Sequence, residues 1–144
     1  MRTVFSGAEI FDGTGSAPAA ADVVVEDGRI VDVGAGLDGD ESVDVSGRTL
    51  LPGLFDTHVH VMIAHLDLWR LVQTPFSYRF YQAIHNLQAT LDIGITTVRD
   101  AGGADLGLKQ AIADGLIAGP RVQLSISMLS QTGEIGRASC RERV

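Results

Sequence analysis

The chain has almost no cysteine, few positive charges and no long hydrophobic run. Its single cysteine, Cys140, lies near the end of the chain, so residues 1–133 hold no disulfide framework and no thiol nucleophile or thiolate ligand. Lys and Arg number 11 against 18 Asp and Glu, for a net charge of −7. An acidic chain with scattered charges argues against nucleic acid or an anionic membrane surface as its partner.

Hydrophobic segments are short throughout the sequence. None approaches the ~18 apolar residues that a membrane-spanning helix needs, and the N-terminus lacks the unbroken apolar segment of a signal peptide. We therefore expect no membrane partner and a cytoplasmic location. The 144 residues are 45% hydrophobic, which is enough for a buried core, and the length corresponds to about one domain.

The last residues, Glu134–Val144, read EIGRASCRERV. This string resembles the in-frame translation of a common sequencing adapter, whose next codon is a stop. Such scars carry no information about the native fold. The alternative is a genuine Arg-rich tail. We expect Glu134–Val144 to be non-native and residues 1–133 to be the amino-terminal piece of a longer protein.

Residues 1–52 predict short strands separated by turns. Ala21–Glu26 is rich in valine, and Arg29–Val33 alternates polar and apolar residues as a half-buried strand does. Asp27-Gly28 between them is a strong signal for a two-residue hairpin turn. No helical pattern interrupts these segments. The sequence therefore predicts a small antiparallel β unit over residues 1–52.

The pattern changes after Pro52-Gly53. Strand-like and helix-like segments alternate, which is typical of βαβ units and a parallel sheet. We predict strands over 54–61, 95–99 and 121–126, and helices over 64–73, 76–91 and 106–118. These three strands show no sign of closure, and an eight-stranded (β/α)8 barrel needs roughly 250 residues, more than this chain has.

His58 and His60 lie near the carboxyl end of the first of these strands. Side chains at i and i+2 share one face of a strand, so the two imidazoles are expected to point together, with Thr57, Val59 and Val61 on the other face. Two converging imidazoles are typical ligands of a divalent metal such as zinc. The alternative interpretation is that His58 and His60 are surface histidines on a polar strand face.

Asp100 ends the second predicted strand of this region. The carboxyl ends of barrel strands carry active sites, so Asp100 is a candidate substrate-binding residue. Its alternative is a carboxylate that caps the following loop, Ala101-Gly102-Gly103. Lys109, the only lysine, falls on the exposed side of a predicted helix and is interpreted as a solvated charge.

Several of these motifs resemble one known family. Leu51–His60 resembles the signature of the amidohydrolase superfamily, and Gly94–Gly103 resembles the second barrel strand of its imidazolonepropionase-like and Xaa-Pro dipeptidase-like branch. Gly119–Val122 and Thr132-Gly133 are similar to the next strand and loop. That branch usually continues with Gly-His-Gly, whereas Glu134-Ile135 stands here. The departure begins where the adapter-like segment begins.

The resemblance implies an α/β fold in two parts. Residues 1–52 would form a small amino-terminal β-sandwich portion, and residues 53–133 the first three βα units of an incomplete (β/α)8 TIM barrel. His58 and His60 match the first two metal ligands, for one or two divalent ions, with zinc expected. The remaining ligands of the family, a Lys, two later His and an Asp that also acts as base, have no counterpart here, so no catalytic residue is assigned.

The function implied for the whole protein is metal-dependent hydrolysis of a C–N bond by activated water. The substrate would be a small molecule, a cyclic amide or amidine, or a dipeptide, and a homo-oligomer is an open expectation. Two alternatives remain. One is a non-catalytic scaffold with the amidohydrolase fold. The other is that the 144-residue chain, as encoded, is an inactive truncated fragment.

Overall fold

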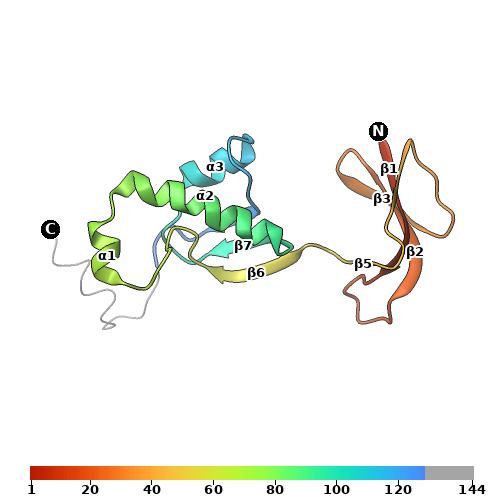
Figure 1. Cartoon of the computed structure of the whole chain (residues 1–144), viewed down its shortest axis with the longest axis horizontal. Coiled ribbons are helices and arrows are strands. Elements are labelled where there is room, and N and C mark those ends of the chain that lie inside the picture. The colour runs from red at the N-terminus through yellow and green to blue at the C-terminus, as the bar shows by residue number, and fades with distance from the viewer. Residues whose placement is uncertain (129–144) are drawn as a thin grey trace. The chain divides into compact units, whose positions relative to one another are not determined.

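The computed structural model describes residues 1–128 (Figure 1). The chain divides into two compact units, the first comprising Met1–Pro52 and the second beginning at Gly53. The adapter-like segment Glu134–Val144 and the Thr132-Gly133 motif lie outside the described residues.

The first unit contains a single sheet of five strands. The strand order is β3-β2-β1-β4, and β5 also pairs with β1. The strands are β1 (Arg2–Ile10), β2 (Ala19–Glu26), β3 (Arg29–Gly34), β4 (Glu41–Asp44) and β5 (Thr49–Leu50). Within residues 1–128 this unit has one layer, so the second layer of a β-sandwich stays a prediction.

The pairing directions correct one expectation. β1 pairs with β2, and β2 with β3, in the antiparallel sense, but β4 and β5 run parallel to β1. The segment after β3 crosses to the far side of β1, where Asp40 donates its backbone N–H to the Arg2 carbonyl over 2.8 Å. Alternation along a strand predicts which face is buried but carries no information on strand direction, so the antiparallel prediction for residues 1–52 was wrong here.

The turn between β2 and β3 confirms the hairpin prediction. Asp27 and Gly28 have φ of 50° and 72°, and a type I′ turn requires positive φ at both central residues. Glycine adopts this conformation without steric cost.

The second unit alternates strands and helices, as the sequence predicts. Its strands β6, β7 and β8 form a parallel sheet in that order. The elements are β6 (Leu54–Val59), α1 (Leu68–Gln73), α2 (Phe76–Asp92), β7 (Ile95–Asp100), α3 (Leu106–Ala113) and β8 (Arg121–Leu124). This is a mixed α/β arrangement.

Four predicted segments were too long, including the third strand, which as β8 ends at Leu124 instead of residue 126. β6 ends at Val59 instead of residue 61, so His60 lies just beyond the strand. α1 begins at Leu68 because the Asp67 side chain caps it, accepting the backbone N–H of Arg70. α3 ends at Ala113, and Gly115 follows with φ of 71°, a conformation common at helix ends.

One hydrophobic core holds the second unit together. Helices α2 and α3 lie on one side of the sheet (Figure 1), with α2 against β7 and α3 against β8. Ala83 and Leu87 are the buried residues of α2, because their spacing of four places both on one helix face. The core comprises Val61, Met62, Ala83, Leu87, Val98, Ala104, Leu108 and Val122.

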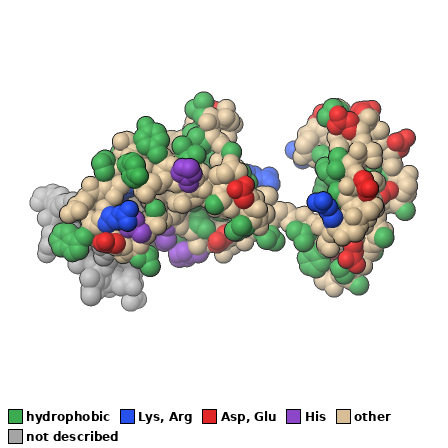
Figure 2. Space-filling view, in the orientation of Figure 1, with side chains coloured by type: hydrophobic (Ala, Val, Ile, Leu, Met, Phe, Trp, Pro, Cys, Tyr) green, Lys and Arg blue, Asp and Glu red, His purple; other side chains and the backbone are tan. Residues whose placement is uncertain are grey.

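Hydrophobic side chains also gather on the surface over α1 and α2 (Figure 2). Trp69 and Phe76 are 79% and 73% exposed, and Phe76 stacks edge-on against the partly buried Phe80. Among residues 1–128, no helix combines the length and hydrophobicity needed to cross a membrane.

Candidate metal centre

His58 lies at an irregular point near the end of β6. The register between β6 and β7 shifts between Asp56 and Val59, which is a β-bulge. The Asp56 side chain supports the bulge because its Oδ1 accepts the backbone N–H of His58 over 3.0 Å. Bulges redirect side chains next to functional sites. Here the bulge leaves both Thr57 and His58 exposed.

The predicted alternation therefore holds only in part. Val59 and Val61 do pack in or against the core as expected, and neither His58 nor His60 is part of it. Thr57 does not join them, since the bulge breaks the two-residue period between Asp56 and Val59.

His60 is half-buried and held by a specific contact. Its ring Nδ1 lies 2.9 Å from the carbonyl oxygen of Gly102. A carbonyl oxygen only accepts hydrogen bonds, so Nδ1 must carry the proton and donate it. In the neutral ring this leaves the lone pair of Nε2 free. Metal-bound histidines commonly have this arrangement, with the second ring nitrogen donating to a backbone carbonyl.

The two imidazoles have a separation that suits one ion. Their ring centres lie 5.3 Å apart, with the planes at 80°. Two imidazoles that bind one tetrahedral ion at Zn–N distances of about 2.0–2.1 Å have ring centres roughly 5 Å apart. Neutral nitrogen ligands also suit zinc. The donor set of His58 and His60 therefore fits a divalent metal.

Asp100, the candidate substrate-binding residue, is completely buried at the end of β7. Its Oδ2 accepts the backbone N–H of Val61 over 2.9 Å. Its Oδ1 accepts those of Gly102 and Ala104 over 2.9 and 3.3 Å. This geometry corresponds to the loop-capping alternative. A contact with substrate stays a prediction.

Two residues of the site were not singled out from the sequence. Gly102 supplies the carbonyl that binds His60, and Asn86 on α2 donates its Nδ2 to the carbonyl of Val61 over 2.9 Å. A polar side chain within the apolar stripe of α2 is a signal that points to Asn86. The role of Gly102 depends on a residue far away in sequence, and no local pattern reveals it.

No third ligand is present in the described part of the chain. Within residues 1–128, no group of three or more His, Cys, Asp or Glu side chains is arranged to hold a metal. A structural or catalytic zinc takes at least three protein ligands. His58 and His60 alone would therefore supply only part of the ligand set that a zinc site requires.

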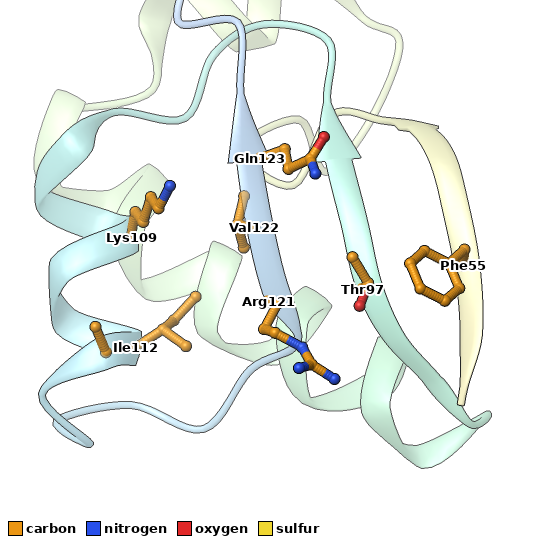
Figure 3. Close-up of a pocket in the computed structure, with 8 residues that line it drawn as sticks. Phe55, Thr97, Lys109, Ile112, Arg121, Val122 and Gln123 are labelled. Atoms are coloured by element: carbon orange, nitrogen blue, oxygen red, sulfur yellow. The ribbon is translucent and has the colours of Figure 1, made fainter. Parts of the chain in front are cut away.

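A hollow of about 510 Å³ is lined by residues of the sheet and of α3 (Figure 3). Lys109 and Ile112 of α3 line one side of it, and Phe55 of β6 lines the other. Neither His58 nor His60 contributes to its wall. Arg121, Val122 and Gln123 of β8 lie between these two sides, and no His, Cys, Asp or Glu side chain lines the hollow.

The chain belongs to the amidohydrolase family. The model of the Amidohydrolase family matches residues 49–144, which confirms the resemblance carried by the motif around His58 and His60. The matched range includes Glu134–Val144, whose assignment to an adapter stays a prediction.

Curated relatives match parts of the chain. A dihydroorotase from Trichlorobacter lovleyi is 38% identical over 64 residues, which is 42% of this chain and 15% of the relative. Adenine deaminase 1 from Rhizobium meliloti is 30% identical over 109 residues, which is 67% of this chain and 19% of the relative. The chain thus spans less than a fifth of the length of either relative.

Solved structures match more of the chain. A prolidase complexed with N-methylphosphonate-L-proline has a TM-score of 0.86 and 37% identity, covering 94% of this chain and 34% of its own. A Xaa-Pro dipeptidase with bound methionine has a TM-score of 0.75 and 26% identity, covering 92% of this chain and 35% of its own. The described fold is that of the amino-terminal part of such proteins.

Proposed function

We propose that the complete protein is a metal-dependent hydrolase of C–N bonds. It would pair a β-sandwich domain, to which residues 1–52 contribute, with a (β/α)8 barrel that begins with residues 53–133. The observation that carries this proposal is the pair His58 and His60 at the carboxyl end of β6, with the tautomer of His60 set by Gly102. Membership of the amidohydrolase family supports it.

His58 and His60 would hold the metal through neutral imidazole nitrogens. We propose zinc, as one or two ions, with the missing ligands and the acid–base carboxylate on later strands. The chemistry that a divalent metal supplies in such sites is polarisation of the scissile carbonyl and a lowered pKa of bound water. The hydrogen bond from Nδ1 to Gly102 keeps the His60 ring in one orientation, which lowers the entropic cost of binding.

We propose a dipeptide with a prolyl amide bond as the first substrate to test. Similarity to the prolidase extends over 94% of this chain, whereas similarity to the dihydroorotase extends over 42%. Cyclic amides and amidines are the competing substrate classes, since a dihydroorotase and adenine deaminases are among the relatives. A cytoplasmic location and homo-oligomer formation stay predictions.

The test uses the complete reading frame, recovered from the source DNA and expressed as full-length protein. We expect bound divalent metal and hydrolysis of Xaa-Pro dipeptides that stops on chelation and returns when zinc is restored. His58→Ala and His60→Ala should lower the metal content, and turnover should fall by more than the roughly 10–100-fold that loss of an outer-shell partner costs. His85→Ala, which removes an exposed imidazole of α2, is the matched control and should change neither. Unchanged metal content in both ligand variants would refute the proposal.

The 144-residue chain by itself is a separate case. We propose that it is inactive, because its described residues supply two imidazoles where a metal centre needs more ligands. Sequencing the source DNA beyond the codon for Gly133 tests the tail. A frame that continues with Gly-His-Gly supports the adapter assignment. A genomic frame that encodes Glu134–Val144 and then stops contradicts the adapter assignment and favours a protein without catalysis. A full-length sequence that lacks the later metal ligands also favours a protein without catalysis.

A further inference from the structure

Asp100 is a buried carboxylate that the proposed chemistry does not use. It is the one charged residue that is fully buried among residues 1–128. Burying a carboxylate is costly unless it is paired or well hydrogen-bonded. The salt bridge found in the described residues, between Arg2 and Asp32, lies in the other unit. Backbone hydrogen bonds must therefore offset the cost of burying Asp100.

The hydrogen bonds of Asp100 join two separate segments. Oδ2 holds the backbone N–H of Val61, the residue directly after His60. Oδ1 holds the N–H groups of Gly102 and Ala104 in the loop between β7 and α3. One side chain thus sets the distance between the His60 segment and this loop.

The loop between β7 and α3 also contacts the His60 side chain. The carbonyl of Gly102, whose N–H is bound by Asp100, accepts the Nδ1 proton of His60 over 2.9 Å. The backbone N–H of Ala101 also donates to the Val59 carbonyl over 2.8 Å. The residues before and after His60 are therefore both held by hydrogen bonds. The Gly102 carbonyl, which Asp100 positions, orients the His60 ring.

We propose that Asp100 is a positioning residue for His60. Its carboxylate holds the β7–α3 loop so that the Gly102 carbonyl fixes the Nδ1-protonated tautomer of His60 and presents Nε2 outward. Full burial, with both oxygens engaged, favours this role over a contact with substrate. The part that concerns metal affinity rests on the proposed function. The part that concerns the tautomer rests on the contacts alone.

The test compares Asp100→Asn with Asp105→Ala in the complete protein. Asn keeps the size of Asp but replaces one accepting oxygen with a donor, so it cannot satisfy both segments. Asp105 accepts the N–H of Leu108 and caps α3, so its removal destabilises the fold without touching His60. The first readout is the protonated nitrogen of His60, followed by nitrogen NMR of selectively labelled histidine in the metal-free protein. The second is zinc affinity by competition with a chromophoric chelator.

We expect wild type and Asp105→Ala to keep the Nδ1–H tautomer and the same zinc affinity, although Asp105→Ala unfolds at a lower temperature. Asp100→Asn should give a mixture of tautomers and about 10–100-fold weaker zinc binding. If Asp100→Asn does not fold, Asp100→Glu, which keeps the charge but displaces the loop, is measured in the same way.

Either Asp100 variant, folded and with the wild-type tautomer and affinity, would overturn the positioning role. A wild-type protein without a zinc site at His58 and His60 would instead defeat the proposed function. In that case the tautomer measurement alone decides whether Asp100 positions His60.

Discussion

The substitution Gly102→Ala tests whether the conformation of the loop after β7 orients His60. Gly102 has φ of 145°, where side-chain-bearing residues are rare, and such strain costs about 1–3 kcal/mol. A Cβ at this position would lie 2.8 Å from the backbone nitrogen of Met128, so the loop has to shift. If the shift breaks the hydrogen bond to His60, another ~0.5–1.5 kcal/mol is lost. Gly102→Ala should therefore reduce the free energy of unfolding by about 2–4 kcal/mol.

Gly103→Ala is the matched control for this change. Gly103 also has a positive φ, 114°, but its added Cβ would meet only the Cβ of Met62 at 3.5 Å, an ordinary contact. The cost should then be the backbone strain alone, about 1–3 kcal/mol. The hydrogen bond that orients His60 comes from the Gly102 carbonyl and should persist.

The assay is urea unfolding of the metal-free complete protein, followed by zinc competition with a chelator. Gly102→Ala should be less stable than Gly103→Ala by about 1 kcal/mol and should alone lose zinc affinity, by roughly 10–100-fold. Equal destabilisation in both variants, combined with unchanged zinc affinity in Gly102→Ala, would refute the link between this loop and His60.

Three further substitutions test the core, the α2 contact and the first unit. Leu87→Ala removes a fully buried side chain and should lower the free energy of unfolding by about 3–5 kcal/mol in urea titrations. Asn86→Ala leaves the Val61 carbonyl without its donor, so we expect a loss of about 1–3 kcal/mol by the same titration. The pKa of Asp22 is lowered because its carboxylate accepts the N–H groups of Gly7, Leu37 and Gly36. Asp22→Asn should therefore reduce the thermal stability of the first unit at pH 7, and the difference from wild type should shrink as the pH falls below ~3.9.

Each of these expectations has a result that contradicts it. A loss below ~1 kcal/mol for Leu87→Ala would mean that α2 is not packed as described. An Asn86→Ala protein as stable as wild type would show that water replaces the Nδ2 donor. For Asp22→Asn, a difference in thermal stability from wild type that stays constant through the acid range would exclude the proton linkage. The hydrogen bonds that lower the pKa of Asp22 stabilise the folded protein only while the carboxylate is ionised.

Much of the fold follows from local pattern. The hairpin at Asp27-Gly28 follows from turn chemistry, and the alternation of strands and helices after Gly53 follows from hydrophobic periodicity. The His58 and His60 pair is visible as a motif, and family membership confirms what that motif resembled. In each case the relevant interaction lies within a few residues or within one element.

Other features could not be derived from pattern. The parallel placement of β4 and β5 beside β1 depends on where the chain crosses, which alternation does not encode. The bulge that exposes Thr57 depends on the register between β6 and β7. Register is a property of two strands together, so a single strand pattern predicts its faces but not its irregularities.

The sequence by itself determined which side chains can bind a metal, because imidazole chemistry and a spacing of two residues are both local. Only the tertiary structure decided how His60 is oriented, since its partner Gly102 lies 42 residues away. It also decided that Asp100 is buried and tied to Val61, at a separation of 39 residues. A backbone carbonyl or N–H is present at nearly every residue, so its position after folding, and not its identity, makes it part of a site.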